Sequence, residues 1–145
     1  MIGRIRTGGR AYRGHVLVRW TATPGKPGDR PTDESELAAH FRLRKAAGSG
    51  YFEISHPDLS HLYPWMTFGF LEDLAVIEAF RSEEQMQILC GDGIAPSSDV
   101  FAIPVMDELA SFTGEYVSSV DRAWTVVTAF IASDCTELVG DWHDL

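Results

Sequence analysis

The sequence predicts an α+β fold: an antiparallel sheet of about five or six strands, with a C-terminal amphipathic helix packed on it and a shorter N-terminal helix. Three observations lead to this prediction. The chain has 145 residues, of which 45% are hydrophobic, so it has the size and apolar content of one domain with one core. Between residues 51 and 104, hydrophobic and polar side chains alternate as in half-buried strands. Over residues 120–132 the hydrophobic spacing becomes that of a helix face.

The first 31 residues are expected to form a basic hairpin followed by a loop. Residues 2–8 and 15–23 are predicted strands, the second of them rich in β-branched and aromatic side chains. Residues 23–31 contain three prolines and two glycines, which prevent regular structure. Because this hairpin is too short to fold alone, residues 1–145 are interpreted as a single domain whose α+β body is residues 32–145.

A short helix is predicted after this loop. Asp33 and Glu36 have the spacing of a capping box, and Leu37 and Phe41 lie on one helical face. The Gly-Ser-Gly sequence at residues 48–50 is expected to end the helix.

Strands dominate the middle of the chain. They are predicted over residues 51–55, 65–71, 74–80, 85–90 and 100–103. The second, third and fourth of these form an antiparallel meander with one solvent-exposed face, on which Gln85 and Gln87 lie. A helix over residues 74–87 is the alternative, and the alternation within residues 85–90 argues against it. The last strand is expected to end at Pro104.

The helix over residues 120–132 is the strongest single prediction. Ser118 and Ser119 precede it and suit an N-cap. We expect Trp124, Val127 and Phe130 to be buried. After the helix, residues 136–142 offer one more short extended segment. The apolar residues that share one face of the helix are Val120, Ala123, Trp124, Val127, Phe130 and Ile131.

The charge of the chain is strongly asymmetric. Its net charge of −9 combines ten Lys and Arg against four Asp and Glu in residues 1–50 with two against seventeen in residues 51–145. An acidic surface of this kind repels nucleic acid and attracts a basic partner. The alternative is that the acidic residues only keep the protein in solution.

Eight acidic residues are candidates for a partner-binding surface. They interrupt otherwise apolar segments, so they are expected at turns or on exposed faces, where they are free to make contacts. These residues are Glu72, Asp73, Glu83, Glu84, Asp92, Asp99, Asp107 and Glu108.

No catalytic residue, metal site or cofactor site is predicted. His56, Asp58 and His61 form the closest group of polar residues, but their loop spacing is not specific for a metal. Cys90 alternates with apolar neighbours and is interpreted as a core thiol rather than a nucleophile. The sequence has no phosphate loop, nucleophile elbow or dinucleotide-binding motif. The alternative hypothesis is a small enzyme or ligand-binding protein that uses the loop of His56, Asp58 and His61.

Contacts with nucleic acid or with a membrane are not expected. The N-terminal arginines, together with Tyr12 and Trp20, could contact RNA, but the acidic remainder of the chain would weaken phosphate binding. No apolar run approaches the ~20 residues of a membrane-spanning helix, and the first residues do not form a secretory signal. Cys90 and Cys135 lack the spacing of a disulfide framework. The expectation is a cytoplasmic protein that is a monomer or a weak homodimer.

The stretch from residue 51 to residue 142 also resembles a known family. The matching features are Met66-Thr67-Phe68-Gly69 in the meander, Gly91 after its third strand, Phe101-Ala102-Ile103-Pro104, and the closing segment from Ala123-Trp124 to Trp142. This pattern resembles the first family of immunity proteins from bacterial polymorphic-toxin systems. The resemblance implies an antitoxin without catalysis of its own, which binds and neutralises a cognate toxin domain, commonly a nucleic-acid deaminase or nuclease. The sequence therefore predicts an immunity protein that meets a basic toxin domain through its acidic surface.

Overall fold

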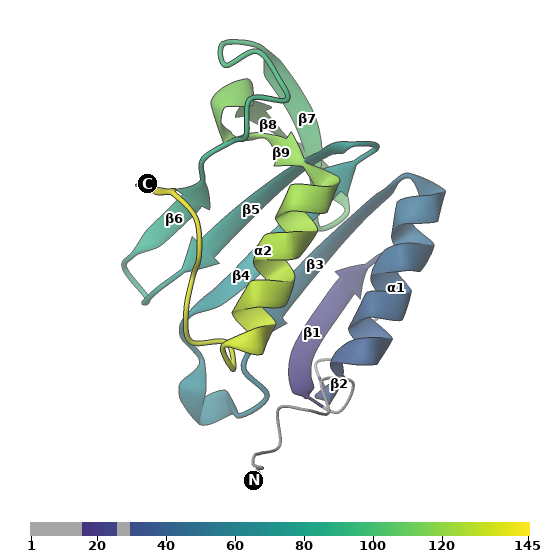
Figure 1. The fold of residues 1–145 in the computed structure, drawn as a ribbon, viewed down its shortest axis with the longest axis vertical. Coiled ribbons are helices and arrows are strands. Elements are labelled where there is room, and N and C mark those ends of the chain that lie inside the picture. Colours follow the sequence, from purple (N-terminus) through teal and green to yellow (C-terminus); the bar gives the residue numbers. More distant parts are fainter. Residues whose placement is uncertain (1–15, 26–29) are drawn as a thin grey trace, which may run out of the picture.

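The fold is built on an antiparallel sheet that carries two helices on one face and a β-hairpin on the other (Figure 1). The structure is a computed structural model and describes residues 16–25 and 30–145. The predicted α+β class is therefore confirmed. Of the predicted N-terminal hairpin, residues 2–8 lie outside the described residues, while residues 17–23 form a strand as expected.

The main sheet has eight strands among the described residues. Five of them have four or more residues and the other three have two or three, which agrees with the predicted sheet of about five or six strands. Neighbouring strands follow the order β10 (Trp142–Asp144), β6 (Met86–Leu89), β5 (Leu74–Phe80), β4 (Trp65–Leu71), β3 (Ser49–Ser55), β1 (Leu17–Thr23) and β2 (Thr32–Asp33), and β9 (Ser118–Ser119) pairs with β5.

The predicted meander is confirmed, and β4 and β5 have the predicted bounds. On β4 the side chains of Met66, Phe68 and Phe70 point to the helices and are completely buried. Side chains at alternate positions of a strand point to opposite faces, so Trp65, Thr67 and Gly69 face the other side of the sheet. Burial of three large side chains from one strand fixes its register, because a slip of one residue would expose all three.

Helix α2 (Val120–Ala132) has the bounds that the sequence predicts. Ser119 is its N-cap, and the Ser119 hydroxyl accepts a hydrogen bond from the backbone N–H of Arg122 at 3.2 Å. Val127 and Phe130 are completely buried. Trp124 is only half-buried, contrary to the prediction, and its ring stacks on Phe41 of the other helix with ring centroids 4.1 Å apart.

Helix α1 (Glu34–Ala47) lies beside α2 on the same face of the sheet (Figure 1). Asp33 is its N-cap, but the Asp33 side chain makes no capping hydrogen bond, so the predicted capping box is wrong. The N–H of Glu34 instead donates to the carbonyl of Val16 at 2.7 Å, which satisfies this helix end through strand pairing. Gly48 ends the helix as predicted, with a φ of 96° that glycine adopts without strain.

A hairpin of β7 (Val100–Val105) and β8 (Glu108–Thr113) crosses the helix-free face of the sheet behind β4 (Figure 1). The predicted strand does not end at Pro104, and β8 was not predicted. Proline is tolerated inside β7 because this strand pairs along one side only, with β8. The hairpin packs closely: a Cβ atom at Gly69 would lie 2.3 Å from the carbonyl oxygen of Pro104. Glycine at this position of β4 therefore lets the hairpin rest on the sheet.

The C-terminal part of the sheet differs from the prediction in three ways. Gln87 is buried rather than on a solvent-exposed face, because β10 pairs with β6 and the Gln87 amide donates to the Asp144 carboxylate at 2.6 Å. The final extended segment is β10, at Trp142–Asp144, and not residues 136–142. Cys90 is only half-buried, so it is not a core thiol, whereas Cys135 is buried and burial raises the pKa of its thiol to about 12.

Candidate partner-binding surface

The helix-free face of the sheet, here named the open face, combines polar and aromatic side chains. Its residues are the alternate positions that do not point to α1 and α2. Strand pairing arranges them in rows across the sheet, and successive rows are two residues, or about 6.6 Å, apart. The central row holds Thr21, Glu53, Thr67 and Glu78. The next row towards the hairpin holds Thr23, Tyr51, Gly69 and Val76. On the other side of the central row lie two pairs, Arg19 with Ser55 and Trp65 with Phe80.

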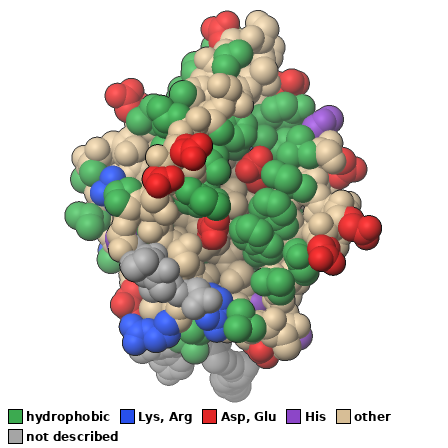
Figure 2. Space-filling view, turned by 180° about the vertical axis from the view of Figure 1, so that it is seen from behind, with side chains coloured by type: hydrophobic (Ala, Val, Ile, Leu, Met, Phe, Trp, Pro, Cys, Tyr) green, Lys and Arg blue, Asp and Glu red, His purple; other side chains and the backbone are tan. Residues whose placement is uncertain are grey.

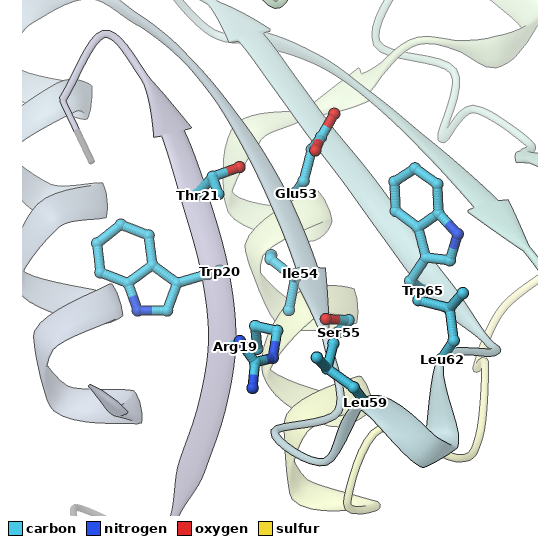
Figure 3. A pocket seen from close by; sticks show the side chains of 9 residues that line it. All are labelled: Arg19, Trp20, Thr21, Glu53, Ile54, Ser55, Leu59, Leu62 and Trp65. Atoms are coloured by element: carbon cyan, nitrogen blue, oxygen red, sulfur yellow. The ribbon is translucent and has the colours of Figure 1, made fainter. Parts of the chain in front are cut away.

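Two adjoining hollows lie where the β7–β8 hairpin leaves β1 and β3 uncovered, and together we name them the open-face groove. They share Thr21 and Glu53. The first hollow has a volume of about 230 Å³ and is lined by Arg19, Trp20, Thr21, Glu53, Ile54, Ser55, Leu59, Leu62 and Trp65 (Figure 3). The second has a volume of about 380 Å³ and is lined by Thr21, Ala22, Thr23, Tyr51, Glu53, Met106 and Asp107.

A carboxylate lies at the centre of this groove. The Tyr51 hydroxyl donates a hydrogen bond to Oε2 of Glu53 at 2.9 Å, which holds the Glu53 side chain in place. Burial and the neighbouring Glu53 carboxylate raise the pKa of Tyr51, so its hydroxyl stays protonated and remains a donor at neutral pH. Glu78 lies in the same row as Glu53, and burial raises the pKa of its carboxyl group. The Glu53 carboxylate, which lines both hollows, suits acceptance of hydrogen bonds and positive charge from a partner.

The other end of the groove is aromatic and apolar. Trp65 stacks on Phe80 with ring centroids 4.2 Å apart, and Leu59 and Leu62 are exposed beside it. Figure 3 shows Glu53 and Trp65 projecting on the same side of the sheet, with Leu62 next to Trp65 and Leu59 next to Ser55. Nη2 of Arg19 donates to the carbonyl of Pro57 at 2.8 Å at this end. Aromatic side chains flanked by polar groups are typical of the centres of protein interfaces.

All eight predicted partner-binding residues are exposed, but the structure does not bring them together. Glu72 and Asp73 form the turn between β4 and β5, whereas Glu83 and Glu84 lie between β5 and β6. These two turns are at opposite ends of the seven-residue strand β5, roughly 20 Å apart at 3.3 Å per residue. The hairpin turn holds Asp107, which lines the open-face groove, and it leads into Glu108 at the start of β8. Asp99 directly precedes β7.

Asp92 has a structural role in the loop after β6. Its carboxylate accepts hydrogen bonds from the backbone N–H groups of Ile94 at 3.1 Å and Ser119 at 3.0 Å. Although partial burial raises the pKa of Asp92, these two hydrogen bonds and the nearby charge of Arg122 outweigh it and hold the pKa below its usual value. Asp92 thus joins this loop to the N-terminus of α2, so its replacement would affect folding as well as binding.

Sequence reasoning missed Glu53 and Glu78. Each lies inside a segment that the sequence predicts as a strand, whereas the predicted partner-binding residues are acidic residues expected at turns or on exposed faces. The available signal was the alternation itself: Glu53 lies between Phe52 and Ile54, which both point to the helices, so its carboxylate must point to the open face.

The loop after β3 uses its polar groups to hold its own shape. Nδ1 of His56 accepts a hydrogen bond from the N–H of Asp58 at 3.0 Å, so the ring proton lies on Nε2, which is 3.4 Å from the Asp134 carboxylate. The Asp58 carboxylate accepts the N–H of Ser60 at 2.9 Å. The ring of His61 lies 4.9 Å from that of His56. Within residues 16–25 and 30–145, no three His, Cys, Asp or Glu side chains are placed to share a metal ion.

Comparison with protein-family models and with curated proteins found no match to this chain. Of the helices that the structure describes, none has the length and apolar character needed to cross a membrane.

Proposed function

We propose that the protein is an immunity protein, an antitoxin that binds and neutralises a basic toxin domain acting on nucleic acid, either a deaminase or a nuclease. The observation that carries this proposal is the large number of carboxylates that have no basic partner among residues 16–25 and 30–145. Of the seventeen Asp and Glu in residues 51–145, Asp121 alone forms an ion pair with a lysine or arginine that the structure describes, to Lys45 at 2.7 Å. The negative charge of this region is therefore available to a partner.

The two arginines of residues 51–145 do not neutralise this charge by ion pairing. Nη1 of Arg122 donates to the Cys90 carbonyl at 3.2 Å and to the Ser118 hydroxyl at 3.1 Å. The guanidinium of Arg81 donates to the side-chain oxygen of Gln87. Both are engaged with neutral groups, so the field outside this part of the molecule stays negative.

The open face is the surface on which this charge meets apolar side chains. Figure 2 shows acidic side chains dispersed among hydrophobic ones over this face, while most of the basic side chains in view gather at its lower edge. A toxin that binds a phosphate backbone needs a positively charged groove. An acidic surface with aromatic side chains can occupy such a groove, since its carboxylates replace the phosphates and its apolar residues supply contact area.

The resemblance of residues 51–142 to the immunity family supports the same class of function. Under this proposal the partner is the cognate toxin domain, the protein acts in the cytoplasm where the toxin would reach nucleic acid, and it carries out no catalysis of its own. The protein is a monomer or a weak homodimer that forms a heterodimer with the toxin domain.

The experiment uses the toxin domain encoded next to the gene for this chain. We expect the purified chain to bind this domain and to protect cells that express it. Because the charges steer association, the association rate should fall as salt rises and the Debye length shortens to ~8 Å at physiological ionic strength. A variant with Glu83→Lys, Glu84→Lys and Asp99→Lys should bind more slowly, whereas Glu83→Gln with Glu84→Gln should have a smaller effect. Asp92 is left unchanged because it holds the loop to α2.

Equal affinity and equal cell survival for wild type and the lysine variant would show that these acidic turns do not form the interface. Absence of binding between the wild-type chain and the adjacent toxin domain, together with unprotected cells, would reject the immunity function itself.

A further inference from the structure

We propose that the open-face groove binds an extended segment of the toxin domain, with an apolar side chain against Trp65 and a basic side chain between Glu53 and Asp107. This inference rests on the proposed function and specifies how the partner is recognised. It follows from the spacing of the groove, the chemistry of its two ends and the position of its charges.

The groove runs along the strands, which suits an extended occupant. Its first hollow includes Arg19 and its second includes Thr23, so it follows five consecutive residues of β1. Its rows of side chains repeat every two residues, at about 6.6 Å. An extended segment repeats its own side chains at the same interval, so residues i and i+2 of the partner can occupy successive rows without strain.

The end near Trp65 accepts an apolar side chain. The indole is held by its stacking on Phe80, so little conformational freedom is lost when a partner covers it. Leu59 and Leu62 are 60% and 46% exposed and would gain burial from the same contact. Arg19 also lies at this end and donates to the Pro57 carbonyl, so a basic residue of the partner is placed at the other end.

The end near the hairpin accepts a cation. Its carboxylates come from Glu53 and Asp107, and none of the described residues that line this hollow is lysine or arginine. Glu53 is already oriented by the Tyr51 hydroxyl, so its carboxylate need not be ordered during binding. Met106, which is 57% exposed, lies next to Asp107 and can cover the methylene stem of a long basic side chain. Arginine fits best because its planar guanidinium can donate to two carboxylates at once.

Synthetic peptides test this assignment without the toxin. The probes are acetylated and amidated hexapeptides of glycine and serine with leucine and arginine two positions apart, prepared in both orders, and matched peptides with glutamate in place of arginine. They are titrated into the full chain, and binding is followed by NMR chemical shifts of the Trp65 indole N–H and the Tyr51 and Asp107 amides.

We expect at least one leucine–arginine peptide to shift all three signals, and the glutamate peptide to bind at least about tenfold more weakly, as loss of a charge-assisted pair requires. The double variant Glu53→Gln with Asp107→Asn should lose this preference. The matched control, Glu137→Gln with Asp141→Asn in the exposed segment between α2 and β10, should retain it. Thermal unfolding of each variant establishes that the fold is kept.

In the peptide titrations, any of three results would overturn the groove assignment: no shift at peptide concentrations of about 10 mM, equal binding of the arginine and glutamate peptides, or an unchanged preference in the double variant. Shifts of the same signals with protein concentration alone would identify a second copy of the chain as the occupant and would also overturn it. Binding measurements with the toxin domain distinguish failure of the groove assignment from failure of the immunity function. If the double variant binds that domain as wild type does, the groove assignment fails while the immunity function stands. If wild type does not bind the toxin domain, the immunity function fails. The peptide titrations then still test whether the groove binds an extended segment with a basic side chain.

Discussion

Replacement of Gly69 by alanine tests whether the β7–β8 hairpin is seated on the sheet as the structure describes. The new Cβ would lie 2.3 Å from the Pro104 carbonyl oxygen, and ordinary contact begins near 3.4 Å, so the hairpin backbone must retreat by about 1 Å. Overpacking of this kind costs ~1–3 kcal/mol. Without the hairpin contact, Gly69→Ala would stabilise the protein, because alanine is favoured over glycine inside a strand by ~0.5–1 kcal/mol.

The assay is thermal unfolding followed by circular dichroism. A cost of ~1–3 kcal/mol at ~2–4 °C per kcal/mol predicts a Tm lower by roughly 2–12 °C in a domain of this size. Amide hydrogen exchange should accelerate first in β7 and β8, because their contact with Gly69 is the one disturbed. A Tm that is unchanged or raised would refute the reasoning and show that the hairpin does not rest on β4.

Three further replacements test the core, the helix cap and a half-buried carboxyl group. Phe130→Ala should lower the free energy of unfolding by ~3–5 kcal/mol through the cavity left in the core, measured by urea denaturation; an unchanged midpoint would contradict the burial of this face of α2. Ser119→Ala should cost ~1 kcal/mol because the N–H of Arg122 loses its partner, and Ser119→Gly should cost only a few tenths. For Glu78, burial raises the folded-state pKa above the unfolded value of 4.5, so its contribution to stability is present below that value and is lost as pH rises through the folded pKa. Glu78→Gln should remove this loss of stability with rising pH, measured as the urea midpoint at a series of pH values. If the midpoints of wild type and variant change identically with pH, Glu78 is not the source of the pH dependence.

The sequence predicted best the elements whose signals are local. The bounds of β4 and β5 follow from side-chain alternation between turn residues, and α2 begins directly after the serine that caps it. Each signal comes from residues adjacent in the chain, so no knowledge of the rest of the fold was needed.

Other features depended on contacts between distant segments. Pro104 looked like the end of a strand, and only the position of β7 at the edge of a two-stranded sheet lets it stay inside. Alternation predicts that Gln87 lies on the solvent-exposed face, because its hydrogen-bond partner Asp144 is far away in the sequence and no local pattern indicates their contact. Glu53 was visible as a charge within a strand, but its place in a groove depends on where Asp107 and the hairpin lie.

The order in which the layers arise along the chain has a consequence for synthesis on the ribosome. The meander β3 to β6 is made of consecutive strands and can pair as soon as it emerges, since its contacts are local. Its apolar face, with Phe68 and Phe70, is covered in part by α2, which is translated later, after the β7–β8 hairpin. During that interval the nascent chain displays an incompletely covered hydrophobic sheet, the kind of surface that chaperones bind and that aggregates when left exposed. Slow translation of residues 90–132 would lengthen this vulnerable interval without altering the folded protein.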